Sequence, residues 1–313
     1  MSVFTSVCTS DIEQFLKHYH CGELTDFQGI IEGISNSNFH LTATGGEFIL
    51  TIYEHIETEQ LEKILELQDH LHQSGVSCAK IMKTQSGALF NSLANKPASI
   101  IEKLPGNTKF SVTNHLCQQI GLTLAQFHLS AVNFDFAIQN PRGAAWISAI
   151  STKLMQHLSA KDQKILRQEL DFLSRYSQLS LPAGAIHADL FPDNALVKDD
   201  ILTGIIDFDL ACHEVYLFDL CISINAWCSQ PDGQLDRILM RDMLTAYSSV
   251  RSLTQDENIS IPMMLRTTAL RFWLSRLNDK IFPADGELTF NKDPDEFKNI
   301  LLARRQRLSG MQR

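Results

Sequence analysis

Residues 186–209 read IHADLFPDNALVKDDILTGIIDFD, and this stretch does most to decide the fold. Its apolar arms, residues 195–197 and 202–206, flank the polar turn 198–200, which predicts a β-hairpin. Folding the hairpin about that turn brings Asn194 and Asp207 together at its open end. An amide oxygen beside a carboxylate offers the hard oxygen ligands that magnesium takes together with substrate phosphates. The pair is therefore a candidate site for a magnesium-bound nucleotide.

Asp189 lies on the loop that enters this hairpin, five residues before Asn194. A carboxylate there can meet an acceptor hydroxyl beside the γ-phosphate, which makes Asp189 the candidate catalytic base. His187 joins the catalytic set as the residue that orients the loop by hydrogen bonding, rather than as a proton carrier. Taken singly, such Asp and Asn residues are commonly turn formers or helix caps. Their order within a hairpin favours the chemical interpretation.

The rest of the chain predicts an α+β fold with two domains. Before the turn residues 104–107, the pattern indicates strands near 29–33 and 48–53, a hairpin turn at Gly45-Gly46, a helix from Glu57 to Gly75, and short strands at 88–90 and 99–101. Beyond it, helices are expected after a cap at Thr113 or Asn114 and at 144–158, 161–178, 216–228, 234–250 and 261–278. We predict an N-terminal nucleotide-binding lobe at 1–103 and a C-terminal catalytic and substrate-binding lobe at 104–313.

Composition narrows the class of protein. The 313 residues are 44% hydrophobic and 20% charged, as in ordinary globular proteins, and the formal net charge of -9 argues against a nucleic-acid partner. The sequence contains no uninterrupted apolar run of about eighteen residues, so no membrane span is expected. The seven cysteines include no CxxC pair, and scattered reduced thiols suit a cytoplasmic protein. The His-rich segments 18–21 and 70–72 lack a second half at zinc-ligand spacing.

The ordered motif around Asp189 resembles a known family. His187-x-Asp189-Leu190 with Asn194, followed by Asp207-Phe208, is similar to the catalytic loop and metal aspartate of the protein-kinase-like fold. The fuller string most resembles bacterial homoserine kinases of the aminoglycoside phosphotransferase and choline kinase group, and further likeness lies in Asn140-Pro141-Arg142-Gly143, Ala211-Cys212, Phe218-Asp219-Leu220 and Asn225-x-Trp227-Cys228. The resemblance runs from Phe4 to about Arg307.

This resemblance implies a two-lobed kinase that uses ATP and Mg2+. The implied reaction transfers the γ-phosphoryl group of ATP to the hydroxyl of L-homoserine, giving O-phospho-L-homoserine in threonine biosynthesis. It also implies a phosphate-binding loop at Gly33–Asn38, with Ser35, Asn36, Ser37 and Asn38 as candidate nucleotide contacts. That loop has no GxGxxG motif, so a plain hairpin turn is the alternative.

Two further nucleotide positions follow from the resemblance. The backbone of Glu102 and Leu104 would meet the adenine edge, unless this segment is only a loop that ends an edge strand. Thr51 stands where the kinase fold normally carries a phosphate-binding lysine. This departure agrees with the homoserine kinase branch, and it equally permits a weakened or non-catalytic nucleotide-binding relative.

The acceptor site needs a cation for a carboxylate and an acid for an ammonium group. Arg142 and Arg271 are the candidates for the carboxylate, because a guanidinium group binds a planar anion bidentately. Asp209 and His213 are candidates on the ammonium side, and Asp219 either joins them or braces the catalytic loop. A surface or capping role is the alternative for each. Another small-molecule kinase, acting on an amino alcohol, a sugar or an aminoglycoside, would keep the base and metal residues, and neither GTP as donor nor any oligomeric state is excluded.

Overall fold

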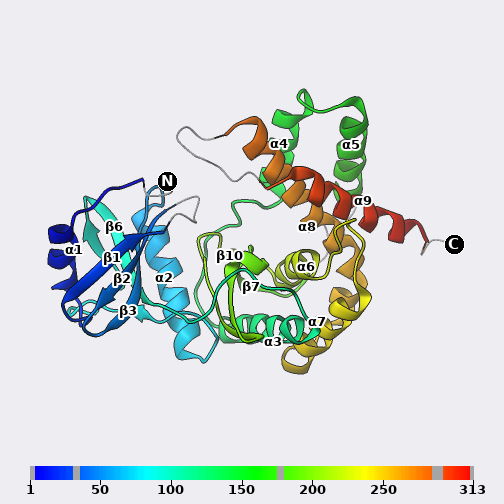
Figure 1. Ribbon diagram of the computed structural model, residues 1–313. Coiled ribbons are helices and arrows are strands. Elements are labelled where there is room, and N and C mark those ends of the chain that lie inside the picture. Colours follow the sequence, from blue (N-terminus) through cyan, green and yellow to red (C-terminus); the bar gives the residue numbers. More distant parts are fainter. Residues whose placement is uncertain (1–3, 31–35, 175–179, 284–291, 311–313) are drawn as a thin grey trace. The chain divides into compact units, whose positions relative to one another are not determined.

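The computed structural model describes residues 4–30, 36–174, 180–283 and 292–310 of the chain. The chain divides into two compact units (Figure 1). Among the described residues, the first unit holds 4–30, 36–106 and 203–206, and the second holds 107–174, 180–202, 207–283 and 292–310. No helix of the described residues is long and apolar enough to cross a membrane.

The first unit is an antiparallel sheet with two helices. Its elements are α1 Thr9–Leu16, β1 Leu24–Gly29, β2 Ser37–Ala43, β3 Gly46–Ile52, α2 Thr58–Gln73, β4 Ile81–Met82, β5 Asn91–Leu93 and β6 Lys96–Glu102. The strand order is β1-β2-β3-β6-β4, and β5 also pairs with β6. Buried side chains alternate along β2 and β3, so one face of these strands packs on the core that α1 also joins.

The hairpin turn predicted at Gly45-Gly46 joins β2 and β3, but it lies one residue earlier, at Thr44 and Gly45. Ala43 pairs with Gly46, which leaves a two-residue loop. A Cβ atom on Gly45 would lie 2.5 Å from the carbonyl oxygen of Cys21, so this position requires glycine. Gly46 already belongs to β3, where its φ is 140°.

Two predicted strands of this unit are misplaced. The strand expected at 29–33 is β1, which ends at Gly29, and residues 31–33 lie outside the described residues. The strand expected at 88–90 is wrong: the strand here is β5, which joins β6 through Ala94 and Asn95. Both turn residues have positive φ, 52° and 61°, and alanine is not a residue that signals such a turn. α1 and β4 have no counterpart among the predicted elements.

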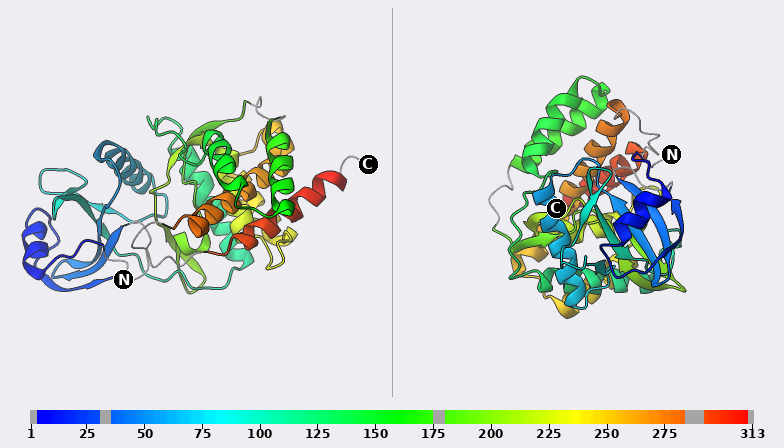
Figure 2. Two further views of the ribbon diagram at one scale, coloured as in Figure 1. Left: turned by 90° about the horizontal axis from the view of Figure 1, so that it is seen from above. Right: turned by 90° about the vertical axis from the view of Figure 1, so that its left-hand side faces the viewer.

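The second unit is mostly helical. Its elements are α3 Asn114–Ser130, α4 Ala144–Met155, α5 Ala160–Ser174, β7 Ala183–Ile186, the 3-10 helix η1 Pro192–Asn194, β8 Ala195–Lys198, β9 Ile201–Ile205, β10 Cys212–Val215, α6 Tyr216–Trp227, α7 Arg237–Val250, α8 Gln255–Ile281 and α9 Pro294–Gly310. The last residues of β9 belong to the first unit. α3 packs against α7, and α8 contacts both α6 and α9 (Figure 2).

The predicted hairpin of residues 195–206 is confirmed as β8 and β9. Its turn is formed by Asp199 and Asp200, whose φ angles of 52° and 61° fit a two-residue hairpin loop. The Thr113 cap is also confirmed, because its side chain accepts a hydrogen bond from the Leu116 N–H (3.1 Å). Within the hairpin, β8 follows directly on η1, and β9 leads toward Asp207.

The predicted helices of this unit exist, and their bounds differ most at α8. α8 begins at Gln255 rather than at 261, because Thr254 and Glu257 form a capping box there. Proline is typical of a first helical turn, but Pro262 lies inside α8. α5 covers 160–174, and the predicted end of that helix at 178 lies outside the described residues.

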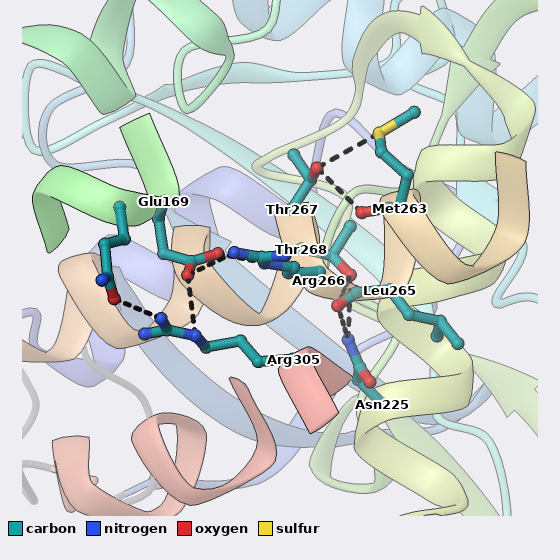
Figure 3. Close-up of polar contacts among 9 residues, drawn as sticks. Glu169, Asn225, Met263, Leu265, Arg266, Thr267, Thr268 and Arg305 are labelled. Atoms are coloured by element: carbon teal, nitrogen blue, oxygen red, sulfur yellow. Dashed lines mark hydrogen bonds and ion pairs between the residues drawn. The ribbon is translucent and has the colours of Figure 1, made fainter. Parts of the chain in front are cut away.

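Three helices of this unit meet around one buried carboxylate (Figure 3). Glu169 on α5 accepts hydrogen bonds from Arg266 on α8, one of them at 2.8 Å, and pairs with Arg305 on α9 at 3.2 Å. Its side chain is 1% exposed. On the next part of α8, Asn225 of α6 donates to the Leu265 carbonyl at 2.8 Å. These contacts fix α5, α6 and α9 against α8.

Candidate active site

The loop that follows β7 is held in an unusual backbone conformation. Ala188 has a φ of 65°, a region that costs a residue with a Cβ about 1–3 kcal/mol. Both backbone N–H groups at the turn are fixed by one carboxylate: the His187 N–H donates to Asp219 Oδ2 and the Ala188 N–H to Asp219 Oδ1, each at 2.8 Å. Asp219 thus braces the loop that presents Asp189.

Asp219 itself is fully buried on α6, where the His128 imidazole contacts its Oδ2 at 3.1 Å. Burial alone would raise the pKa of Asp219. The hydrogen bond from His128 and the contacts with His187 outweigh burial, so the pKa of Asp219 lies below its ordinary value. The group that braces the loop is therefore an anion at neutral pH.

A second contact fixes the far end of the loop. Trp227 at the end of α6 is buried, and its indole N–H donates to the Leu190 carbonyl at 3.0 Å. Asp219 belongs to the motif 218–220, and Trp227 belongs to the motif 225–228. Both motifs act here by hydrogen bonding to the backbone on either side of Asp189.

Asn194 lies against Asp189. Its amide nitrogen donates to the Asp189 carbonyl at 2.8 Å and to Asp189 Oδ2 at 3.1 Å. Because the amide hydrogens point toward Asp189, the amide oxygen is the atom that can act as a metal ligand. η1, which ends at Asn194, places that oxygen next to the start of β8.

Asp207 follows β9 with a φ of 64°, and its side chain is exposed. Its Oδ1 accepts a long hydrogen bond from the Asp209 N–H at 3.4 Å. The negative charge of Asp207 acts on Asp189, so the two carboxylates interact electrostatically. No group of three or more His, Cys, Asp or Glu side chains suited to a metal occurs within the described part of the chain, so a metal here would need the Asn194 oxygen and substrate oxygens.

Asp189 is a partly buried carboxylate, 27% exposed. Removal from water raises its pKa to about 6; the nearby charge of Arg271 opposes the rise and that of Asp207 adds to it. A pKa near the operating pH suits a group that orients a hydroxyl and accepts its proton. The electrostatics of Asp189 thus agree with the role of a base.

Arg271 on α8 is the cation beside this base. Its Nη1 lies 3.8 Å from Asp189 Oδ1, its side chain is 3% exposed, and its Nε has no hydrogen-bond partner within the residues the structure describes. Burial lowers its pKa to about 10, with the positive charge of Arg142 acting in the same direction and Asp189 opposing both. Arg142 stacks on Trp146, 4.7 Å from the ring centre. The two guanidinium groups therefore lie close enough for their charges to interact.

The remaining predicted residues of this unit differ in their surroundings. His187 is fully buried and its Nδ1 accepts a hydrogen bond from the Asp189 N–H at 3.3 Å, in keeping with an orienting role. Asp209 lies next to Asp207 through the contact described above. His213 is exposed on β10, where its N–H donates to the Ile138 carbonyl, and none of the contacts found among the described residues joins it to Asp189.

In the first unit, the predicted phosphate loop is described only for residues 36–38, of which the last two are strand. Ser35 lies outside the described residues, and Ser37 and Asn38 begin β2, which corrects the expected loop 33–38. The Ser37 hydroxyl is buried and donates to Glu54 at 2.5 Å, and Asn36 Oδ1 accepts from the Glu54 N–H at 3.3 Å. The backbone pairing of β2 with β3 decides the conformation here over the small polar side chains.

Thr51 does not replace the missing lysine by a charge. Its hydroxyl donates to Asn38 Oδ1 at 2.8 Å, so the two predicted nucleotide residues bind each other. The Glu102 N–H donates to the Lys80 carbonyl at 2.9 Å, so an adenine contact at Glu102 would have to use its carbonyl group. Leu104 is half-buried and packs close to Gly204.

Sequence reasoning missed the residues behind Asp219. His128 lies in the last turn of α3, where it reads as one more buried position next to Phe127. Tyr247 on α7 is likewise fully buried, and its hydroxyl contacts His128 Nδ1 at 2.7 Å. A polar residue inside an apolar helical stripe was the available signal, but its partners are more than ninety residues away.

Known proteins share both the sequence and the fold. Residues 26–253 match the family described as phosphotransferase enzyme family. The homoserine kinase of Methylobacillus flagellatus is 40% identical over 301 residues, covering 96% of this chain and 94% of the relative. That of Neisseria meningitidis serogroup B is 40% identical over 303 residues, with coverage of 97% and 99%.

Solved structures with the same fold are more distant in sequence. An amicoumacin kinase in complex with AMP-PNP, Ca2+ and Ami has a TM-score of 0.71 at 16% identity, covering 96% of this chain and 93% of its own. A spectinomycin phosphotransferase in complex with ADP and its antibiotic has a TM-score of 0.67 at 15% identity, with coverage of 95% and 94%.

The α+β protein-kinase-like fold and the acid-bearing loop at Asp189 define an ATP-dependent kinase that phosphorylates a hydroxyl group. The chain belongs to the phosphotransferase enzyme family.

Proposed function

We propose that this chain is a homoserine kinase, transferring the γ-phosphoryl group of ATP to the hydroxyl of L-homoserine to give O-phospho-L-homoserine in threonine biosynthesis. Relatives that carry the name homoserine kinase are 38–40% identical over nearly the whole chain. The observation that carries the proposal is the pairing of Asp189, a base with a raised pKa, with buried Arg271. An acceptor with both a hydroxyl and a carboxylate suits this pair.

Asp189 acts as the base. Its backbone is fixed by Asp219 and Trp227 on either side, so its carboxylate is held before substrate arrives. The Asn194 amide holds one of its oxygens. The other oxygen orients the acceptor hydroxyl and takes its proton late in the transfer, while His187 supports the turn.

Asn194 and Asp207 hold Mg2+. The donor set fits this ion, because an amide oxygen and one carboxylate are hard ligands and leave positions for phosphate oxygens and water. When bound, the ion neutralises charge on the phosphates of ATP. Asn194 contacts both the base and this site, so it sets the distance between acceptor and nucleotide.

Arg271 and Arg142 bind the carboxylate of the acceptor. The Nε of Arg271 has no hydrogen-bond partner among the residues described, which leaves a buried donor for an anionic ligand to satisfy. Asp209, beside the metal site, faces the ammonium group, with His213 the weaker candidate because of its exposure.

The first unit supplies the contacts to the nucleotide. The candidates are Ser35, Asn36, Ser37, Asn38, Thr51, Glu102 and Leu104, with the backbone of the last two directed at adenine. Because Thr51 carries no charge, metal and backbone N–H groups must neutralise the phosphates in place of a lysine. The cytoplasmic location stays a prediction from the sequence.

Turnover and binding of two variants test this function. Asp189→Asn keeps magnesium-dependent ATP binding and loses turnover of L-homoserine by at least about 100-fold, the usual worth of a positioned base. Asp207→Ala loses the magnesium dependence of ATP binding, measured by calorimetry with and without the ion. Normal turnover by Asp189→Asn removes the base, and unchanged binding by Asp207→Ala removes the metal site.

A further inference from the structure

A line of buried polar groups runs from the catalytic loop to the start of α8. His128 bridges Asp219 (Nε2 to Oδ2, 3.1 Å) and Tyr247 (Nδ1 to hydroxyl, 2.7 Å). The Tyr247 hydroxyl also accepts from Arg251 at 3.1 Å, and Arg251 pairs with Glu257 at 2.9 Å. Each of these side chains is at most 9% exposed. The line joins α3, α6, α7 and α8, all within the second unit.

The Asp219 end of this line fixes the direction of its hydrogen bonds. Asp219 accepts two backbone N–H groups of the catalytic loop, which keeps it ionised. A carboxylate can only accept, so His128 must present its Nε2 hydrogen to Asp219. Burial lowers the pKa of His128, although the hydrogen bond to Asp219 opposes this, so the ring is neutral and Nδ1 must accept.

The Arg251 end agrees with this direction. Arginine has no acceptor atom, so Arg251 donates to the Tyr247 oxygen, and the hydroxyl hydrogen of Tyr247 is left for His128 Nδ1. Arg251 cannot turn away, because Glu257 pairs with it and is itself fixed in the capping box with Thr254. Its guanidinium group also stacks over Tyr216, 4.7 Å from the ring centre.

We propose that Tyr247, oriented by the Arg251–Glu257 pair, is a positioning residue for phosphoryl transfer: it holds His128 as the neutral tautomer that donates to Asp219, and thereby fixes the loop of Asp189. The inference rests on the proposed function for its kinetic consequence. Tyr247 touches neither Asp189 nor the metal ligands in the contacts described, so it acts only through His128 and Asp219.

The wild-type protein tests the tautomer directly. In protein labelled with 15N-histidine, the His128 ring, assigned by its absence from the spectrum of His128→Gln, is expected as the neutral Nε2–H form at pH 7. An Nδ1–H ring or a charged ring overturns the proposal. This readout needs no turnover, so it decides the matter even if the protein proves inactive on L-homoserine and the proposed function fails.

Tyr247→Phe tests the consequence. It removes the hydrogen bonds that the Tyr247 hydroxyl makes with His128 and Arg251 and keeps the ring, so the His128 tautomer signal should broaden or change, and kcat should fall about three- to tenfold with both KM values within about twofold. Tyr19→Phe is the matched control: this buried hydroxyl has no partner among the described residues, and its loss should leave kcat unchanged. Wild-type kcat and an unaltered His128 signal in Tyr247→Phe contradict the role.

Discussion

At the scale of single residues, Asp189 combines partial burial with the proposed role of proton acceptor. Its pKa of about 6 lies above the value near 3.8 expected in an unfolded chain, so the folded state binds this proton more tightly. The stability that this proton supplies is present below about pH 4 and is lost as the pH rises through about 6. The base is therefore ionised at neutral pH at some cost to the fold, as is common at active sites.

The same pKa predicts the pH dependence of the reaction. Below about pH 6, protonation removes the base, so kcat/KM for the acceptor should fall toward tenfold per pH unit. Profiles from pH 5 to 8.5 at constant ionic strength check this. A kcat/KM that stays flat down to pH 5 speaks against Asp189 as the base.

A variant at Arg271 distinguishes two roles of this residue, binding of the acceptor carboxylate and support of Asp189. The amino alcohol 3-aminopropan-1-ol is homoserine without its carboxylate. Arg271→Gln should lower kcat/KM for L-homoserine by at least about 30-fold, because a buried charged hydrogen bond is lost, and should affect the amino alcohol much less. If the variant loses both activities by the same factor, Arg271 serves only to hold Asp189 at 3.8 Å.

At the scale of elements, the contacts of α8 carry much of the second unit. Glu169 on α5 contacts two arginines, Arg266 on α8 and Arg305 on α9 (Figure 3). Glu169→Gln removes the carboxylate that pairs with these two buried or half-buried arginines, and it should lower the free energy of unfolding by about 3–5 kcal/mol. Urea unfolding measures it.

A matched surface variant shows whether burial is the reason for this loss of stability. Glu66 pairs with Lys63 at 2.8 Å on the outer face of α2, with side chains 39% and 52% exposed. Glu66→Gln should change the free energy of unfolding by less than about 0.5 kcal/mol. Equal effects of the two variants would remove the argument from burial.

Elements were predictable from sequence where local signals agree with tertiary contacts. The hairpin β8–β9 has apolar arms and an Asp199-Asp200 turn, and both survive in the structure. The start of α8 was misplaced although Thr254 and Glu257 form a standard capping box, because Pro262 also resembles a helix start. β5 was misplaced because its turn at Ala94 carries no sequence signal.

At the scale of the whole molecule, the residues of the candidate site also divide into those that the sequence predicts and those that only the fold brings together. Asp189, Asn194 and Asp207 lie within nineteen positions and on one hairpin, so spacing alone could bring them together. The Asp219 brace was one of two alternatives, and the contacts of its carboxylate decide between them. His128 and Tyr247 could not be predicted, because their roles depend on helices that meet only in the folded chain. The expected loop conformation was wrong at Ser37 and Asn38, because the pairing of β2 with β3 extends to them.

The most direct measurement is the product formed from ATP, Mg2+ and a panel of acceptors, followed by 31P NMR and ADP release. The panel contains L-homoserine, choline, ethanolamine, L-serine and an aminoglycoside. We expect O-phospho-L-homoserine, with kcat/KM for L-homoserine at least about 100-fold above the acceptors without a carboxylate, because the buried Arg271 guanidinium suits that group, and also above that for L-serine, as the name of the relatives implies. Preference for another acceptor, or no turnover of any, would contradict this expectation.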